Sequence, residues 1–258
     1  MFNKHPKGLI AAALANLGER FGFYTMMAIL VLFLQAKFGM NGKEAGFIYS
    51  TFYFSIYILA LVGGIIADKT RNYKGTIFTG IVLMAVGYLL LAIPSKTPVD
   101  NKMLYLVITC ASLFVIAFGN GLFKGNLQAL VGQMYDNPQY ANMRDSGFSL
   151  FYMFINIGAI FAPFAAVGVR NWWLSTFGYN YDADLPALCH GQLAGTLSPE
   201  ATETYHTLVT KASTAPVQDY TAFASDYLNV FTTGFHYAFG VAIIAMAISL
   251  TIYWLNKK

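Results

Sequence analysis

The chain has 258 residues, of which 57% are hydrophobic, 16% aromatic and only 11% charged, and its formal net charge is +4. Soluble domains carry about 25% charged residues, so this composition excludes an ordinary soluble domain and predicts an integral membrane protein. The basic residues are scattered in short connections between apolar segments. The positive charge therefore reflects membrane topology and does not indicate a nucleic-acid partner.

Six apolar segments follow one another along the chain, and each is long enough to cross the hydrocarbon core, which takes about 20 residues of helix. They span residues 8–37, 46–67, 75–94, 103–133, 146–168 and 235–255. We therefore expect an all-α membrane protein in the lipid bilayer with six transmembrane helices. Residues 1–168 hold the first five, and residues 235–258 hold the sixth and the end of the chain.

The basic residues of the short connections predict the orientation, because loops rich in Lys and Arg stay on the cytoplasmic side. One side of the membrane carries eight of them: Lys4, Lys7, Lys69, Arg71, Lys74, Arg144, Lys257 and Lys258. The other side carries four: Lys37, Lys43, Lys96 and Lys102. Both termini of this segment are therefore expected on the cytoplasmic side of a cell membrane.

Residues 169–234 form the one long connection, on the expected outer side. It holds six acidic and two basic residues, a net charge of −4. Ser198 followed by Pro199 is typical of a helix start, with a Ser cap and Pro at the first helical position. We expect a small, partly helical extracytoplasmic insert here, and the sequence indicates no function for it.

Glu19 and Arg20 lie near the middle of the first apolar segment, and Lys124 lies within the fourth. A charge at the bilayer centre costs about 2.5–3.5 kcal/mol on translocon scales, so an intramembrane ionisable residue is by default a candidate functional residue. The plainer alternative is that Glu19 and Arg20 form a local pair or an interhelical tie without a role in transport.

Sets of residues that contain several polar side chains recur at three- and four-residue steps on four of the segments, so each set shares one helix face. The sets are Asn16, Glu19, Arg20, Phe23, Tyr24 and Met27; Tyr49, Tyr53 and Tyr57; Asn120, Lys124 and Gln128; and Phe148, Tyr152 and Asn156. At 1.5 Å per residue, Glu19, Tyr57, Lys124 and Asn156 each lie about 14–16 Å from the cytoplasmic end of their helix. These helices thus bring polar groups to the membrane midplane, where transporters bind substrates and coupling ions.

Plainer interpretations exist for the weaker members of these sets. The tyrosines are often packing or interface residues, and Asn156 can serve as an interhelical hydrogen-bonding group. The four histidines show no ligand spacing, so we expect no metal site, and no catalytic or cofactor-binding motif indicates an enzyme.

Three stretches carry recognisable motifs on the first, fourth and fifth segments. Residues 19–24 (ERFGFY), 119–126 (GNGLFKGN) and 151–158 (FYMFINIG) resemble the E-x-x-E-R-F-x-Y-Y, G-N-G-x-F-K-P-N and F-Y-x-x-I-N-x-G motifs of the proton-coupled oligopeptide transporter (POT/PTR) family. Residues 63–69 (GGIIADK) resemble the loop motif that follows the second helix in the major facilitator superfamily. The resemblance covers essentially all of the chain except the insert.

The resemblance implies one major-facilitator half-bundle, built as a 3+3 inverted repeat, that takes part in the symport of di- and tripeptides with protons and needs no cofactor. The residues implied in substrate binding are Arg20, Tyr24, Tyr57, Lys124 and Asn156. Those implied in proton coupling are Glu19 and Lys124. A desolvated cation binds a peptide carboxylate strongly, which agrees with these roles.

The chain departs from the family motifs at four positions. Asn16 replaces the first Glu, Phe23 replaces the first Tyr, Met27 lies where an Arg is frequent, and Gly125 replaces the Pro. The loss of a titratable group at position 16 makes proton coupling less firmly implied than peptide binding. Nitrate or another small solute is an alternative substrate.

The family is expected to have twelve helices in two halves, and this chain holds six. Three explanations account for the difference in helix number. The chain is a piece of a longer transporter, a half-transporter that pairs with a second chain, or a non-transporting remnant. In the first two, a C-terminal six-helix half comes from the same gene or from another chain. A six-helix membrane subunit with a structural or interaction role is the rival from a different class.

Overall fold

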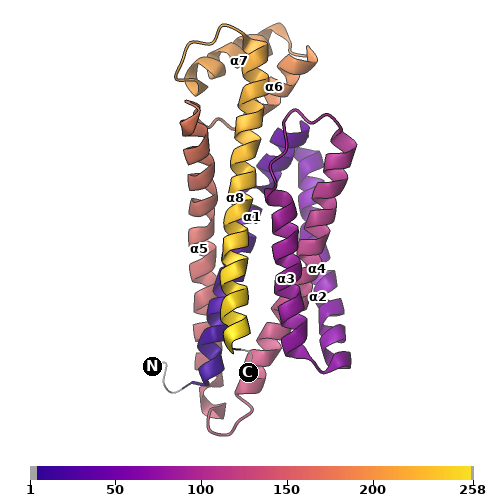
Figure 1. Ribbon diagram of the computed structural model, residues 1–258, viewed down its shortest axis with the longest axis vertical. Coiled ribbons are helices and arrows are strands. Elements are labelled where there is room, and N and C mark those ends of the chain that lie inside the picture. Colours follow the sequence, from indigo (N-terminus) through magenta and orange to yellow (C-terminus); the bar gives the residue numbers. More distant parts are fainter. Residues whose placement is uncertain (1–4, 257–258) are drawn as a thin grey trace.

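A computed structural model describes residues 5–256, so Lys4, Lys257 and Lys258 lie outside the described residues. Six long helices run side by side, and two short ones cover one end of them (Figure 1). The long helices are α1 (Lys7–Phe38), α2 (Gly42–Thr70), α3 (Tyr73–Ala92), α4 (Lys102–Met134), α5 (Arg144–Thr176) and α8 (Tyr220–Asn256). The short elements are α6 (Leu185–Ala194), α7 (Pro199–Ala212) and the 3-10 turn η2 (Ala141–Met143). Residues 5–256 contain no β-strand.

All six long helices are apolar and long enough to cross a membrane, which confirms the expected all-α fold with six spans. The last two helices are longer than expected. α5 continues to Thr176 instead of ending at 168, and α8 begins at Tyr220 instead of 235. Polar residues in 220–234 lower the local hydropathy, but a helix that projects beyond the membrane tolerates them. The Asp219 carboxylate caps its start by accepting hydrogen bonds from the amides of Thr221 and Ala222, both at 2.9 Å.

Local capping explains the sharp turn between α1 and α2. Gly39, directly after the end of α1, adopts the left-handed conformation with φ +60° that glycine favours. Asn41 then begins α2 with a capping box. Its side chain accepts from the amides of Lys43 and Glu44, and the Glu44 carboxylate accepts from the Asn41 amide at 3.0 Å.

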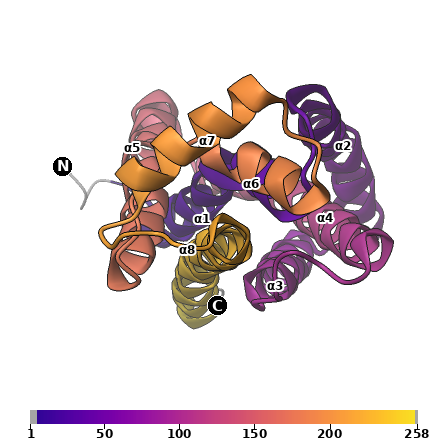
Figure 2. The ribbon, with the colours of Figure 1, turned by 90° about the horizontal axis from the view of Figure 1, so that it is seen from above.

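α1 lies in the middle of the bundle, with α5 and α8 on one side and α4 on the other (Figure 2). Glycines allow the close approach of its neighbours. A Cβ on Gly18 would lie 2.3 Å from the Ser249 hydroxyl of α8, and one on Gly158 would lie 2.7 Å from the Leu17 carbonyl of α1. Van der Waals packing of this kind holds membrane helices together, because lipid offers no hydrophobic driving force between them.

α5 and α8 extend into both ends of residues 169–234, and the part between them holds α6 and α7. Ser198 caps α7 as the sequence predicts, with its hydroxyl accepting from the Ala201 amide at 3.2 Å. The insert is bound to the start of α8, because the Tyr205 hydroxyl donates to the Tyr220 carbonyl at 2.7 Å. It also contacts the end of α1, where the His190 ring bonds the Ala36 carbonyl at 2.7 Å.

Candidate functional site

Glu19 and Arg20 form a buried ion pair in the middle of α1. Glu19 is 0% exposed and Arg20 is 5% exposed. The guanidinium donates from Nε to Oε2 at 2.5 Å and from Nη2 to Oε1 at 2.6 Å, so the pair is bidentate. Arg20 also lies over the Phe23 ring, 4.8 Å from its centroid. The two charges thus satisfy each other within one helix, and Arg20 does not face an open surface in this structure.

Asn120 of α4 joins this pair from the neighbouring helix. Its Nδ2 donates to Glu19 Oε1 at 2.7 Å, so the carboxylate accepts three hydrogen bonds. The Asn120 Oδ1 atom and the Tyr88 hydroxyl of α3 are both buried and have no hydrogen-bond partner among residues 5–256. The pair is therefore also an interhelical tie between α1 and α4, which the sequence analysis left as an alternative to a role in transport.

Several positions of the motif on the fourth helix, residues 119–126, contact neighbouring helices. Gly119 packs against Gly80 of α3, where a Cβ would lie 2.7 Å from the carbonyl oxygen. Gly121 packs against Leu59 of α2 in the same way, at 2.5 Å. Asn126 Nδ2 donates to the Gly63 carbonyl at 3.0 Å, so the motif holds α2 and α3 against α4. Gly125, where the family has Pro, faces open space.

Lys124 and Tyr57 lie together at the surface of the bundle. The Lys124 ammonium is 5.6 Å from the centroid of the Tyr57 ring, which is a cation–π contact. The Tyr57 side chain is 52% exposed, and its hydroxyl bonds that of Tyr53 at 3.1 Å. Within residues 5–256 the ion pairs are Glu19–Arg20 and Arg144–Asp136, so Lys124 has no acidic partner there.

Tyr24 and Asn156 are also exposed, on α1 and α5. Asn156 lies two residues before Gly158, which packs against Leu17 and Phe21, so it is at the depth of Glu19. The contacts between Glu19 and Asn120 and between Lys124 and Tyr57 join the other helices at a similar depth. The contacts therefore agree with the depth estimated from sequence, although Glu19 and Arg20 face inward while the other predicted site residues face outward.

The exposed polar residues have a physical consequence. Polar groups that face lipid at the midplane are costly, so such residues normally face a water-filled cavity or another part of a protein. These side chains come from four helices, Tyr24 from α1, Tyr57 from α2, Lys124 from α4 and Asn156 from α5, and we refer to the four together as the midplane face. The surface is well suited to be one wall of an aqueous site.

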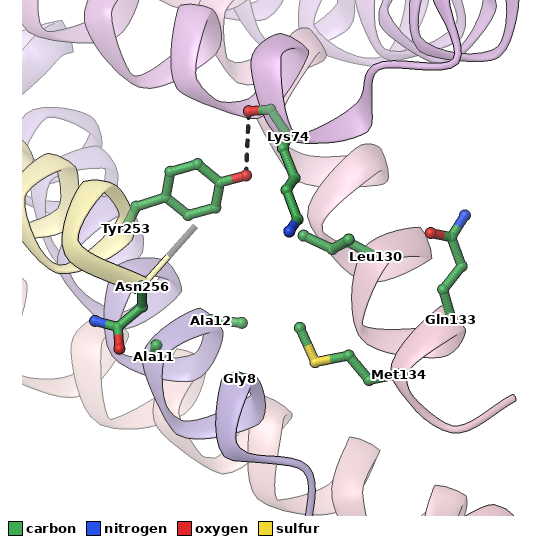
Figure 3. A pocket seen from close by; sticks show the side chains of 9 residues that line it. All are labelled: Gly8, Ala11, Ala12, Lys74, Leu130, Gln133, Met134, Tyr253 and Asn256. Carbon is green, nitrogen blue, oxygen red and sulfur yellow. Dashed lines mark hydrogen bonds between the residues drawn. The ribbon is translucent and has the colours of Figure 1, made fainter. Parts of the chain in front are cut away.

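A cavity of about 350 Å³ lies far from this face, at the opposite end of the bundle from the insert. Figure 3 shows its lining, in which the Tyr253 hydroxyl donates to the Lys74 carbonyl at 3.1 Å. Gly8 in its wall is 11 residues before Glu19, about 16 Å along α1. This cavity is therefore separate from the midplane face.

Three buried side chains, those of Lys37, Arg170 and His236, were not predicted from the sequence. Lys37 and Arg170 lie in segments that the sequence indicates as loops. Lys37 is 2% exposed, and its ammonium donates to the Ser95 carbonyl at 2.5 Å. Arg170 is buried within α5 and stacks on Tyr181, 3.6 Å from the ring centroid. His236 of α8 is also buried. An isolated basic residue directly beside an apolar run was the available signal, but a sequence does not show whether such a side chain turns inward.

Comparison with known sequences points to transporters. The profile of PTR2, described as the POT family, matches residues 74–258. The peptide transporter YePEPT of Yersinia enterocolitica subsp. palearctica serotype O:3 (strain YE-P4) is 34% identical over 185 residues, which cover 70% of this chain and 34% of the relative. The dipeptide and tripeptide permease A of Enterobacter sp. (strain 638) is 34% identical over 179 residues, which cover 69% of this chain and 32% of that relative. The chain thus spans about a third of the length of these curated relatives.

Solved structures agree with the sequences. The crystal structure of a peptide transporter POT in complex with sulfate has a TM-score of 0.65 at 26% identity, over 98% of this chain and 38% of that one. A POT family transporter in complex with 5-aminolevulinic acid has a TM-score of 0.61 at 25% identity, over 97% of this chain and 38% of that one. The six helices of this chain therefore correspond to one part of a larger transporter fold.

Proposed function

The chain belongs to the POT family, and from this premise we propose that it forms one six-helix half of a proton-coupled symporter for di- and tripeptides. The observation that carries the proposal is the midplane face, where Tyr24, Tyr57 and Asn156 are exposed and Lys124 is half-buried. Lipid does not tolerate such polar groups at the depth that the helix rise predicts for them. A second six-helix half, from the same polypeptide or another chain, would face it and enclose the substrate. Transport between two such bundles, without covalent chemistry, is the proposed activity.

Lys124 is the proposed site for the negative charge of the substrate. It has no acidic partner within residues 5–256, and the Tyr57 ring lies beside its ammonium. A peptide carboxylate would accept charge-assisted hydrogen bonds from it, which are stronger than neutral ones. Tyr24, Tyr57 and Asn156 would hydrogen-bond the peptide backbone, because a hydroxyl or amide both donates and accepts.

Glu19 is the proposed proton-coupling group on α1, since position 16 of this chain is Asn. Its carboxylate holds Arg20 and Asn120, so protonation would remove the charge that keeps Arg20 inside the helix bundle. The released guanidinium could then bind the substrate carboxylate together with Lys124. Protonation and substrate binding would be linked in this way through Arg20.

We also propose that the protein resides in the inner or plasma membrane with both termini of this segment in the cytoplasm. The support is the distribution of basic residues over the short connections. In that orientation α6 and α7 lie outside the cell. A cysteine introduced in α7, tested with a membrane-impermeant thiol reagent on intact cells, would be labelled.

The test of the substrate site is uptake of a labelled dipeptide by the full-length protein in liposomes with an imposed pH gradient. Lys124→Ala should abolish uptake, whereas Lys43→Ala, the same charge change at an exposed position of α2, should leave it unchanged. If Lys124→Ala transports at the normal rate and with the normal pH dependence, the site assignment is wrong. The rival interpretation, a structural subunit, would then be favoured.

Proton coupling is tested separately with Glu19→Gln. Uptake by this variant should no longer increase when a proton gradient is applied. Its folding must be checked first, because the substitution leaves Arg20 buried without its partner. A folded variant whose uptake still responds normally to the gradient would exclude Glu19 from the coupling mechanism.

A further inference from the structure

A second polar site lies at the insert end of the bundle, away from the midplane face. A cavity of about 260 Å³ lies between α1, α3, α4 and α8 and opens at the surface of the bundle. Most of its wall is apolar, but Lys37 and His236 both line it. We call it the insert-end cavity. Neither residue belongs to the motifs on which the proposed function rests.

Lys37 points into the bundle instead of reaching out to water. Basic side chains near helix ends normally extend to the membrane surface, yet Lys37 is 2% exposed. Its ammonium donates to the carbonyls of Ser95 at 2.5 Å and Lys96 at 3.4 Å. The Tyr105 ring of the lining has its centroid 6.0 Å from the ammonium. An ammonium has three donors, so one N–H makes no hydrogen bond to the protein and is available to a ligand in the cavity. No carboxylate within residues 5–256 pairs with this charge.

His236 supplies an unused acceptor to the same cavity. It is 4% exposed, and its Nδ1 bonds the Leu91 carbonyl at 2.6 Å. A carbonyl only accepts, so Nδ1 carries the hydrogen, and Nε2 of the neutral ring is an acceptor. Nε2 is buried and has no partner among residues 5–256. A ligand that satisfies both side chains must accept from Lys37 and donate to His236.

The rim of the cavity faces the membrane at the level of the lipid headgroups. Leu90, Ile93 and Ile108 of the lining are exposed apolar side chains, as expected of a surface that contacts lipid. α3 has 20 residues, which correspond to about 30 Å, the thickness of the hydrocarbon core. Leu91 and Ile93 at its end therefore lie where the acyl chains meet the headgroups.

We propose that the insert-end cavity binds an anionic phospholipid whose headgroup carries hydroxyl groups. The phosphate would accept from the Lys37 ammonium and neutralise its charge, and a headgroup hydroxyl would donate to His236 Nε2. The acyl chains would lie along the exposed apolar residues of α3 and α4. The proposal is independent of the peptide-transport function, because it involves neither Lys124 nor Glu19.

The test is native mass spectrometry of the detergent-purified full-length protein, titrated with phosphatidylglycerol and with phosphatidylcholine of the same acyl chains. Choline offers no hydroxyl, so we expect phosphatidylglycerol to bind about tenfold more tightly. Lys37→Met should weaken phosphatidylglycerol binding by about tenfold or more, because it removes a charge-assisted hydrogen bond. Lys43→Met, with the same charge change at the same end of the bundle, is the matched control.

Equal affinity for the two lipids, or equal loss in Lys37→Met and Lys43→Met, would overturn the proposal. Two further variants cover the case in which Lys37→Met does not fold. Ile93→Trp changes an exposed side chain at the rim and should block lipid entry without disturbing the bundle. His236→Phe should reduce the preference for phosphatidylglycerol over phosphatidylcholine, and an unchanged preference would count against the hydroxyl contact.

Inorganic phosphate distinguishes the two sources of the anion. It should fail to displace bound phosphatidylglycerol even in large excess, because it lacks acyl chains. Complete displacement would show a site for free phosphate and would contradict the assignment to lipid. Uptake measurements do not enter this experiment, so its result is separate from that of the transport assay.

Discussion

Arg20 and Lys124 lie at a similar depth in the bundle but in opposite environments. Arg20 is buried, makes two hydrogen bonds to Glu19 and lies over an aromatic ring. Lys124 is half-buried, has an aromatic ring beside it and has no acid among residues 5–256. The first cation is balanced within the chain, whereas the second has no counter-charge among the described residues. We therefore expect Glu19 and Arg20 to contribute to stability as well as coupling, and Lys124 to contribute to function alone.

The largest expected effect on stability is that of Glu19→Gln. It leaves the Arg20 guanidinium buried without a counter-charge, which should lower the free energy of unfolding by about 3–5 kcal/mol. Denaturant unfolding in detergent measures it. The double variant Glu19→Gln/Arg20→Gln, which removes both charges, should regain much of the loss. A double variant as unstable as the single one would show that the pair is not the source of the effect.

Asn120→Ala should lower the free energy of unfolding by a smaller amount than Glu19→Gln. It removes one hydrogen bond to the Glu19 carboxylate, and hydrogen bonds to charged groups contribute about 1.5–3 kcal/mol. Gln128→Ala, two turns further along α4, is the control and should change stability little. If both variants lose the same amount in the same unfolding assay, α4 as a whole is sensitive and the tie to α1 is not special.

Lys124→Met should have the opposite pattern from Glu19→Gln. Removal of this cation–π contact at the surface of the bundle costs about 1 kcal/mol, so the folded protein should be nearly as stable as the unaltered one. Dipeptide uptake should nevertheless be lost. A large drop in unfolding free energy would mean that Lys124 is a structural residue, and the contrast with Arg20 would disappear.

The smallest effect concerns His190, a titratable group whose partner is a backbone carbonyl. Burial lowers its pKa below the ordinary value, the bond to Ala36 opposes this, and the charge of Lys102 adds to the decrease. The unfolded chain therefore binds the proton more readily, and stability should fall as the pH drops below about 6.5. His190→Gln keeps a donor and should flatten this dependence between pH 7 and 5. A steeper profile in the variant would contradict the sign.

The sequence predicted the parts of this structure that depend on local pattern and length. The six apolar runs correspond to six long helices, and Ser198 caps the start of α7 as predicted. The rise per residue placed Lys124 and Tyr57 at the same level, and their side chains are in contact. The polar stripe on α1 was also visible. What it could not show was that Glu19 and Arg20 turn toward Asn120, because the direction of a face depends on which helices pack around it.

Other features depended on contacts that a single segment does not reveal. Polar residues such as Asp226 and Asn229 in the first part of α8 are typical of a loop, yet they belong to the helix. The insert binds this part of α8, because the Tyr179 hydroxyl donates to the Asp226 carboxylate at 2.5 Å. Lys37 resembled an ordinary loop lysine, although the α3–α4 connection folds over it. Hydropathy locates the part of a helix inside the membrane, and tertiary contacts decide how far it continues.

α8 has a practical consequence for imaging. Its 37 residues form one continuous rod of about 55 Å, which begins beside α6 and α7 and ends at the opposite end of the bundle (Figure 1). Stacking of His206 on Tyr220, with centroids 3.9 Å apart, fixes α7 to the start of that rod. An antibody fragment raised against α7 would therefore keep a constant angle to the membrane helices and could serve as an alignment marker in electron microscopy.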